Sequence, residues 1–196
     1  MYENSKQFII CPICGARVEK FQGFHYVCNK CGWDSLENTI DIYSKDPLSS
    51  PLSNLFPHMF IFYPDYKNPV QHVECASMES FLQSLRVKEP MLQIQICKGY
   101  AGLNAWKLRG CLNDWRKDGI VYWDGKPIVR VSKEYTNLIT RAYDCLFHGN
   151  AVFRELVLPR FKDSILIHSI GHDDPNETLF TELDYRHQLN SLIKKL

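Results

Sequence analysis

Two Cys-x-x-Cys-Gly segments, at residues 11–15 and 28–32, restrict what the start of this chain can fold into. In such a segment the two-residue spacer lets both sulfurs reach one ion, and the glycine relieves the tight turn that follows. Residues 16–27 between the segments are long enough for a β-hairpin. Together these features predict a zinc ribbon with a Zn2+ site closed by four thiolates. The expected metal ligands are Cys11, Cys14, Cys28 and Cys31.

We expect the zinc of this ribbon to be structural. A segment this small has too little core to fold alone, so metal binding would supply part of its folding free energy. Four protein ligands leave no open coordination position for catalysis. Basic and aromatic side chains of the ribbon would permit contact with nucleic acid, although small modules without any ligand carry similar residues. Those side chains are Arg17, Lys20, Lys30, Phe21, Phe24 and Tyr26.

The 196-residue chain leaves room for a larger domain after the ribbon. We predict a zinc ribbon at residues 1–38 and a main domain at residues 39–196. The other four cysteines are single and scattered, which indicates reduced thiols rather than a disulfide framework. A formal net charge of +1 demands neither a nucleic acid nor a membrane as partner. No apolar run is long enough for a transmembrane helix and the start lacks a secretory signal, so we expect a cytoplasmic protein.

Hydrophobic periodicity predicts an α+β main domain, in which helices outnumber the strands of a small antiparallel sheet. The expected strands lie at residues 39–43, 59–63, 70–74 and 164–168. The expected helices lie at residues 74–86, 90–98, 132–147, 154–158 and 181–196. In the second helix Met91 and Ile94 should face inward, and in the last helix the apolar stripe should continue to Leu196.

The helix expected at residues 74–86 combines an apolar stripe with a polar edge. At about 100° per residue, Glu79, Gln83 and Arg86 fall together on the flank of the stripe. A carboxylate at such a border is either a solvated surface charge or a group that lines a pocket. The stripe itself consists of Met78, Phe81, Leu82 and Leu85.

Two segments of the chain resemble the NADAR superfamily: Leu-Ser-Asn-Leu-Phe-Pro at residues 52–57 and Ser-Met-Glu-Ser-Phe-Leu-Gln at residues 77–83. Members of that family carry a Leu-Ser-Asn-Phe/Leu-x-Pro segment and a helix with Val/Met-Glu-x-x-x-Gln. Weaker similarities at residues 105–125, 132–147 and 168–182 extend the resemblance over residues 40–196. The chain departs from the family at Ser80, where many members have histidine, and at Trp106, which interrupts an Ala-Lys pair.

The resemblance implies a hydrolase that cleaves N-glycosidic bonds. Some NADAR proteins remove ADP-ribose from guanine bases, and others hydrolyse a phosphorylated riboflavin-pathway intermediate. Chemistry through an oxocarbenium-like or ring-opened ribose needs a carboxylate near the anomeric carbon. Glu79 matches the family's helix glutamate and is the expected catalytic group. Lys107 matches the family's lysine, and would either form a Schiff base with an opened sugar or hold a phosphate.

Six further residues are candidates for binding the substrate. An amide would hydrogen-bond the ribose or base, a tryptophan would stack on a base, and a guanidinium would hold a phosphate. Each of these residues also has an ordinary structural interpretation as a turn, core or surface residue. The six are Asn54, Gln83, Arg109, Trp115, Trp123 and His168.

Two functional hypotheses from different classes remain. In the first, the chain is an N-glycosidase that acts on an ADP-ribose-containing small molecule or an ADP-ribosylated nucleic acid, with no catalytic cofactor. In the second, it is a zinc-ribbon nucleic-acid-binding protein whose NADAR-like domain only binds ADP-ribose or a partner. Loss of hydrolysis on removal of the Glu79 carboxylate would distinguish the first from the second.

Overall fold

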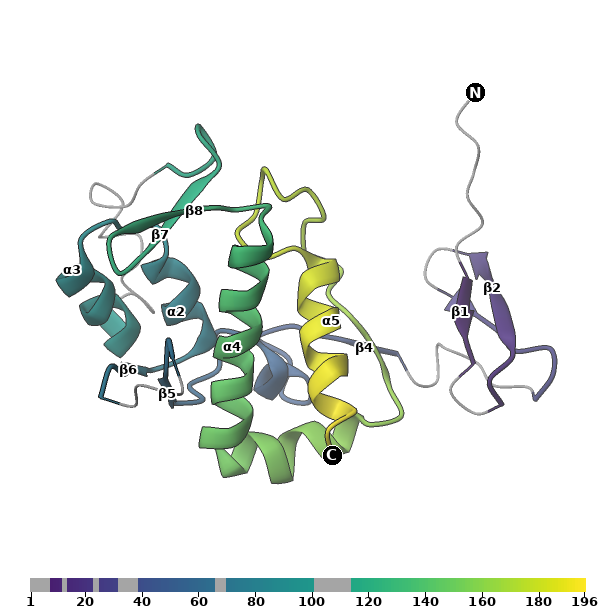
Figure 1. The fold of residues 1–196 in the computed structure, drawn as a ribbon. Coiled ribbons are helices and arrows are strands. Elements are labelled where there is room, and N and C mark those ends of the chain that lie inside the picture. The colour runs from purple at the N-terminus through teal and green to yellow at the C-terminus, as the bar shows by residue number, and fades with distance from the viewer. Residues whose placement is uncertain (1–7, 12–13, 23–24, 32–38, 66–69, 101–113) are drawn as a thin grey trace.

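The computed structural model describes residues 8–11, 14–22, 25–31, 39–65, 70–100 and 114–196. Within these ranges short strands and helices follow one another along the chain (Figure 1), which confirms the expected α+β class. Helices α4 (Lys133–Gly149) and α5 (Glu182–Ile193) lie side by side through the main domain, and the chain enters both from the same end (Figure 1).

Three short strands form an N-terminal antiparallel sheet. The strand β2 (Arg17–Gln22) pairs with β1 (Phe8–Ile10) on one side and with β3 (His25–Tyr26) on the other. The strands β2 and β3 are the hairpin predicted between the two cysteine pairs, whereas β1 was not predicted. Ile165 of the main domain packs against the small buried cluster of this sheet. The cluster consists of Cys11, Val18, Tyr26 and Cys28.

The strands of the main domain form three separate pairs. In the first, β4 (Thr39–Asp41) and β9 (Ile165–Ile167) are parallel, with Ile40 opposite Leu166. The expected antiparallel arrangement therefore does not hold for this pair, because periodicity locates strands but not their partners. It is confirmed for β5 (Phe60–Phe62) and β6 (Val73–Cys75), which pair antiparallel.

The third pair is a hairpin that the sequence prediction missed. It joins β7 (Ile120–Trp123) to β8 (Lys126–Val129) through Asp124 and Gly125. These two residues have φ angles of 49° and 73°, as a two-residue turn with both central residues left-handed requires. The Asp-Gly dipeptide between two β-rich runs was the signal for it.

Helix α2 (Met78–Ser84) begins at Ser77, whose side chain accepts a hydrogen bond from the Ser80 N–H at 3.1 Å. All four residues of the predicted apolar stripe are buried, which confirms the predicted face. The helix is shorter than expected, because residues 73–75 belong to β6.

Helix α3 (Pro90–Gln95) continues into the irregular turn η2 (Ile96–Tyr100). The expectation that Met91 faces inward is wrong, since its side chain is 63% exposed and Gln93 faces the core instead. A helix of two turns has too few apolar positions to fix its rotation, and the hydrogen bonds of Gln93 described below decide it.

Helix α4 is capped by Ser132 and buries an apolar face toward the core. That face contains Tyr135, Ile139, Ala142, Cys145 and Leu146. It leads through the short turns η3 (Phe153–Val157) and η4 (Leu158–Phe161) to β9. Helix α5 starts with a capping box between Thr181 and Asp184. The stripe predicted to reach Leu196 is wrong at its end, because α5 stops at Ile193 and leaves Leu196 exposed. None of the described helices is long and apolar enough to cross a membrane.

The buried amide of Gln93 ties α2 to the β7–β8 hairpin. Its Nε2 donates to the carbonyl oxygens of Val87 at 2.7 Å and Tyr122 at 2.8 Å, and more weakly to that of Ser84, the last residue of α2, at 3.3 Å. Its Oε1 accepts the Asp124 N–H at 2.8 Å. One side chain therefore satisfies backbone groups from two elements that are distant in sequence.

We predict that Gln93→Leu lowers the free energy of unfolding by about 2–4 kcal/mol, because it strands several buried backbone groups at nearly constant volume. Urea unfolding of the full chain measures the change. Gln95→Leu is the matched control on the exposed face of the same helix and should shift stability by no more than about 0.5 kcal/mol. Equal losses in both variants would contradict the anchoring role of Gln93.

Candidate functional site

A cavity of about 320 Å³ opens between α2 and α5. Its volume lies at the lower end of the range for small-molecule sites, about 300–1,000 Å³. One wall is the turn that follows η1 (Ser50–Leu52), and another is the polar edge of α2. Trp115 and residues 168–181, which follow β9, complete the enclosure.

The polar edge of α2 and the turn that follows it carry three connected side chains at i, i+4 and i+7. Arg86 Nη1 donates to Gln83 Oε1 at 3.0 Å, and Gln83 Nε2 donates to Glu79 Oε1 at 2.8 Å. Burial raises the pKa of the Glu79 carboxyl, while the bond from Gln83 and the charge of Arg86 act in the opposite direction. Glu79 therefore holds its proton to a higher pH than an exposed carboxyl does. A carboxyl of this kind can both donate and accept a proton.

Asn54 lies directly beside Glu79. Its backbone carbonyl accepts the Glu79 N–H at 2.8 Å, which fixes the turn against the first turn of α2. Its side-chain Oδ1 accepts a hydrogen bond from the Tyr143 hydroxyl at 2.6 Å. Tyr143 is buried in α4 and stacks on Phe180, a residue of the facing wall.

His168 is held at the end of β9. Its Nδ1–H donates to the carbonyl oxygen of Ile42 at 2.6 Å, which leaves Nε2 as the acceptor nitrogen of the neutral ring. Its ring packs edge-on against Tyr185 of α5. The chain then folds back so closely that a Cβ at Gly171 would lie 2.9 Å from the His168 ring and backbone. Because glycine has no Cβ, it lets the chain at position 171 pass this close to His168.

The lining of the cavity favours an anionic ligand. Glu79 is the only acidic residue among the described residues that line it, and its raised pKa favours the neutral form. The same lining contains the side chains of Arg86, Arg116, His168 and His172. Arg116 donates to the carbonyl oxygen of Glu177, so that its guanidinium is held at the rim.

Five of the predicted catalytic and substrate-binding residues come together in this cavity: Glu79, Gln83, Asn54, Trp115 and His168. Trp123 does not line it; its ring packs 4.9 Å from Phe62 and 5.4 Å from Phe81, measured between ring centroids. Lys107 and Arg109 lie outside the residues that the structure describes.

Sequence reasoning missed several residues of the site. Tyr143 and Tyr185 are fully buried tyrosines whose hydroxyls donate to Asn54 and to the carbonyl of Leu52. Their signal in the sequence was a tyrosine on the apolar stripe of a helix, since a buried phenol needs a partner. Arg116 and residues 178–181 carried no signal, because they join the cavity only through tertiary packing.

A second cavity, of about 480 Å³, lies between β5, β6 and the end of α4. It is larger but mostly apolar, and none of the predicted catalytic or substrate-binding residues that the structure describes lines it. The smaller cavity is therefore the candidate site for chemistry.

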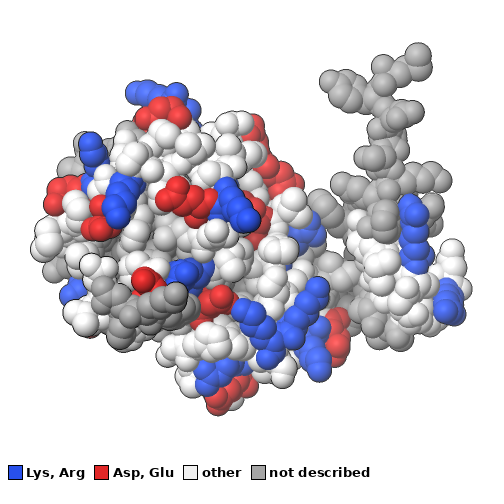
Figure 2. All heavy atoms as spheres, in the orientation of Figure 1, with Lys and Arg blue, Asp and Glu red and all other residues white. Residues whose placement is uncertain are grey.

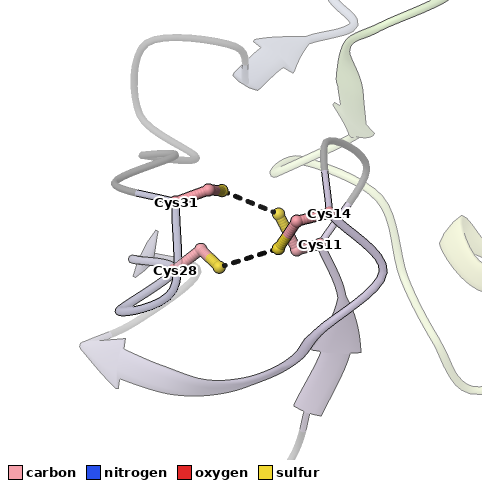
Figure 3. A group of neighbouring side chains, drawn as sticks. All are labelled: Cys11, Cys14, Cys28 and Cys31. Atoms are coloured by element: carbon pink, nitrogen blue, oxygen red, sulfur yellow. Dashed lines mark hydrogen bonds between the residues drawn. The ribbon is translucent and has the colours of Figure 1, made fainter.

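The four cysteines of the N-terminal module converge, as Figure 3 shows. Their sulfurs all lie within 4.8 Å of one another, and the Cys11–Cys31 and Cys14–Cys28 pairs are both 3.6 Å apart. A tetrahedral Zn–S4 centre with bonds of about 2.3 Å places its sulfurs about 3.8 Å apart, so the cluster fits a metal ion. Burial opposes ionisation of Cys28, but backbone N–H groups of Cys31 and Lys30 outweigh it and lower the pKa of the thiol to about 6. None of these cysteines lines the cavity.

We predict that Cys14→Ser abolishes stoichiometric metal binding, because three thiolates no longer close the site. Metal content of the purified full chain, measured by plasma mass spectrometry, checks this. Cys145→Ser removes a buried cysteine from outside the cluster and should keep one metal per chain. Full metal content in Cys14→Ser would rule out the four-thiolate site.

The raised pKa of Glu79 predicts a pH-dependent effect on stability. Between the unfolded and folded pKa values the folded chain binds more protons, so its free energy of unfolding falls as pH rises through that window. Glu79→Gln has no such proton to lose, and its stability relative to the wild type should therefore be higher at about pH 8 than at about pH 4. Urea unfolding at both pH values measures this. Glu134→Gln, at an exposed position of α4, should give the same difference at both. A Glu79→Gln effect independent of pH would show that burial does not perturb this carboxyl.

Comparison with known proteins corrects one expectation. No curated protein and no solved structure matches the chain. A family model does match, over residues 47–194, and its description is Bacteriophage protein GP30.3. The resemblance to the NADAR superfamily is therefore wrong, and the expectation of a NADAR-like fold is not confirmed. The motifs that suggested it are short, and local needs such as a turn at Ser53 and a helix cap at Ser77 favour similar residues in unrelated chains. Because the match covers most of its length, the chain belongs to the Bacteriophage protein GP30.3 family.

Proposed function

We propose that the cavity is the active site of a hydrolase that cleaves the N-glycosidic bond of an ADP-ribosylated base or a related ribosyl-phosphate nucleotide. The observation that carries the proposal is Glu79, whose pKa is raised by burial and which is held by Gln83 in a cavity of small-molecule size. Such a bond breaks when the leaving base is protonated and the cationic sugar is stabilised. One carboxyl with a raised pKa can perform both tasks in turn.

In the proposed reaction Glu79 gives its proton to the leaving nitrogen of the base, and the electrons of the glycosidic bond go with the base. The carboxylate that remains stabilises the positive charge on the sugar. Gln83 and Arg86 favour this charged form. Water then adds its oxygen to the anomeric carbon and returns its proton to Glu79, which restores the acid.

The rest of the lining suits an ADP-ribosyl or nucleotide substrate. Arg116 supplies a cationic group and His172 a ring nitrogen for a phosphate, and Trp115 and Phe180 supply aromatic surface for a base. A Schiff base at Lys107 remains a separate prediction, and the proposed reaction does not require it.

We also propose that the ion held by the cysteine cluster is Zn2+. Four thiolates at tetrahedral spacing favour zinc among the common biological ions. On the face of the molecule that Figure 2 shows, basic and acidic side chains are interspersed over the main domain, which gives no specific support to a nucleic-acid-binding surface there.

We predict that Glu79→Gln lowers the rate at which guanosine is released from ADP-ribosyl-guanosine by at least about 100-fold, because the amide cannot transfer a proton. Chromatography of the released guanosine measures the rate, and calorimetry with ADP-ribose tests whether binding persists. The wild-type rate should fall as pH rises through the pKa of Glu79, since the acid form is then lost.

Glu134→Gln serves as the control and should keep the wild-type rate, because this exposed glutamate lies outside the cavity. An unchanged rate in Glu79→Gln would remove Glu79 from the chemistry. Binding of ADP-ribose without any release of base by the wild type would favour a binding protein over an enzyme.

A further inference from the structure

A hydrogen bond behind the cavity fixes the orientation of Asn54. Tyr143 is 1% exposed, and its hydroxyl donates to Asn54 Oδ1 at 2.6 Å. Burial raises the pKa of Tyr143 well above its usual range, so the phenol keeps its proton and remains a donor. The bond therefore determines which end of the Asn54 amide faces α4.

The other end of that amide is left for a ligand. The oxygen and the nitrogen of an asparagine amide lie in one plane, on either side of the Cβ–Cγ bond. With Oδ1 bound to Tyr143, Nδ2 is the end of the amide left to donate to a ligand in the cavity that Asn54 lines. The backbone bond between Asn54 and Glu79 holds the two residues together. The cavity thus offers an N–H donor next to a carboxyl acceptor.

We infer that this pair selects a ribosyl group with a free hydroxyl next to the anomeric carbon, and that Tyr143 is the positioning residue for Asn54. A hydroxyl matches the pair because it accepts from the Asn54 N–H and donates to a carboxyl oxygen of Glu79. Gln83 occupies only Oε1 of that carboxyl. A 2-deoxy sugar would leave the N–H of Asn54 without this partner. The inference rests on the proposed function, which supplies the sugar, and adds its selectivity.

Calorimetry of the full chain with ADP-ribose and with 2″-deoxy-ADP-ribose measures this selectivity. The wild type should bind ADP-ribose at least about tenfold more tightly, as expected for loss of a hydrogen bond to a buried donor. Tyr143→Phe releases the amide to rotate and should reduce the ratio of affinities to within about threefold. Asn54→Asp keeps an acceptor for Tyr143 but offers no N–H, and should also lose the selectivity.

Tyr135→Phe is the matched control. Tyr135 is another buried tyrosine of α4, and its hydroxyl donates to the backbone carbonyl of Leu179 rather than to a side chain. Its removal should cost similar stability and leave the ratio of affinities unchanged. If the ratio of affinities changed in Tyr143→Phe only because a buried hydroxyl was lost, it would change in Tyr135→Phe as well.

Each outcome decides between the inference and its alternatives. An unchanged ratio in Tyr143→Phe overturns the positioning role, and equal affinities of the wild type for the two sugars overturn the selection. If Glu79→Gln still loses hydrolysis in those cases, the proposed function stands without the inference. Failure of the wild type to bind ADP-ribose overturns the selection, whereas the proposed function is judged by the hydrolysis rate of Glu79→Gln. If Tyr143→Phe does not fold, retained selectivity in Asn54→Asp still overturns the inference.

Discussion

The partial burial of the Glu79 carboxyl is the constraint on which the rest of the candidate site depends. Desolvation opposes its charged form, and Gln83 of α2 and Arg86 of the turn that follows α2 favour that form. Helical geometry sets the spacing of Glu79 and Gln83, and the turn that ends α2 brings Arg86 back to Gln83. The other elements then have only to bury the apolar stripe of α2 and close the space beside its polar edge.

The closure depends on contacts between distant parts of the chain. The parallel pairing of β4 with β9 brings the Ile42 carbonyl to His168, a residue 126 positions later, and so fixes the tautomer of its ring. The close approach of Gly171 to His168 then turns the chain so that His172 and residues 178–181 line the cavity. Opposite them, the bond from Tyr143 sets the amide of Asn54. Each wall is therefore fixed by a backbone or buried polar contact rather than by apolar packing alone.

Local signals in the sequence were sufficient for some of this site and not for the rest. The apolar stripe of α2 located Glu79 and Gln83, and the cysteine spacing located the thiolate cluster, because both patterns are set within a few residues. Tyr143 meets Asn54 across 89 residues, a contact that no local pattern encodes. The β7–β8 hairpin is different, since its Asp-Gly turn was readable. The NADAR resemblance failed because short turn and cap motifs report local geometry and not ancestry.

The thiolate cluster and the cavity are chemically separate, yet the structure links them through one strand. The family match begins at residue 47, so the cysteines lie outside it. Ile165 of β9 nevertheless packs against their buried cluster, and three residues later His168 lines the cavity. A metal bound by these four cysteines would hold the N-terminal module together and so support the strand whose end carries a cavity wall. The metal would then have a structural role, whereas the proposed reaction depends on a carboxyl group.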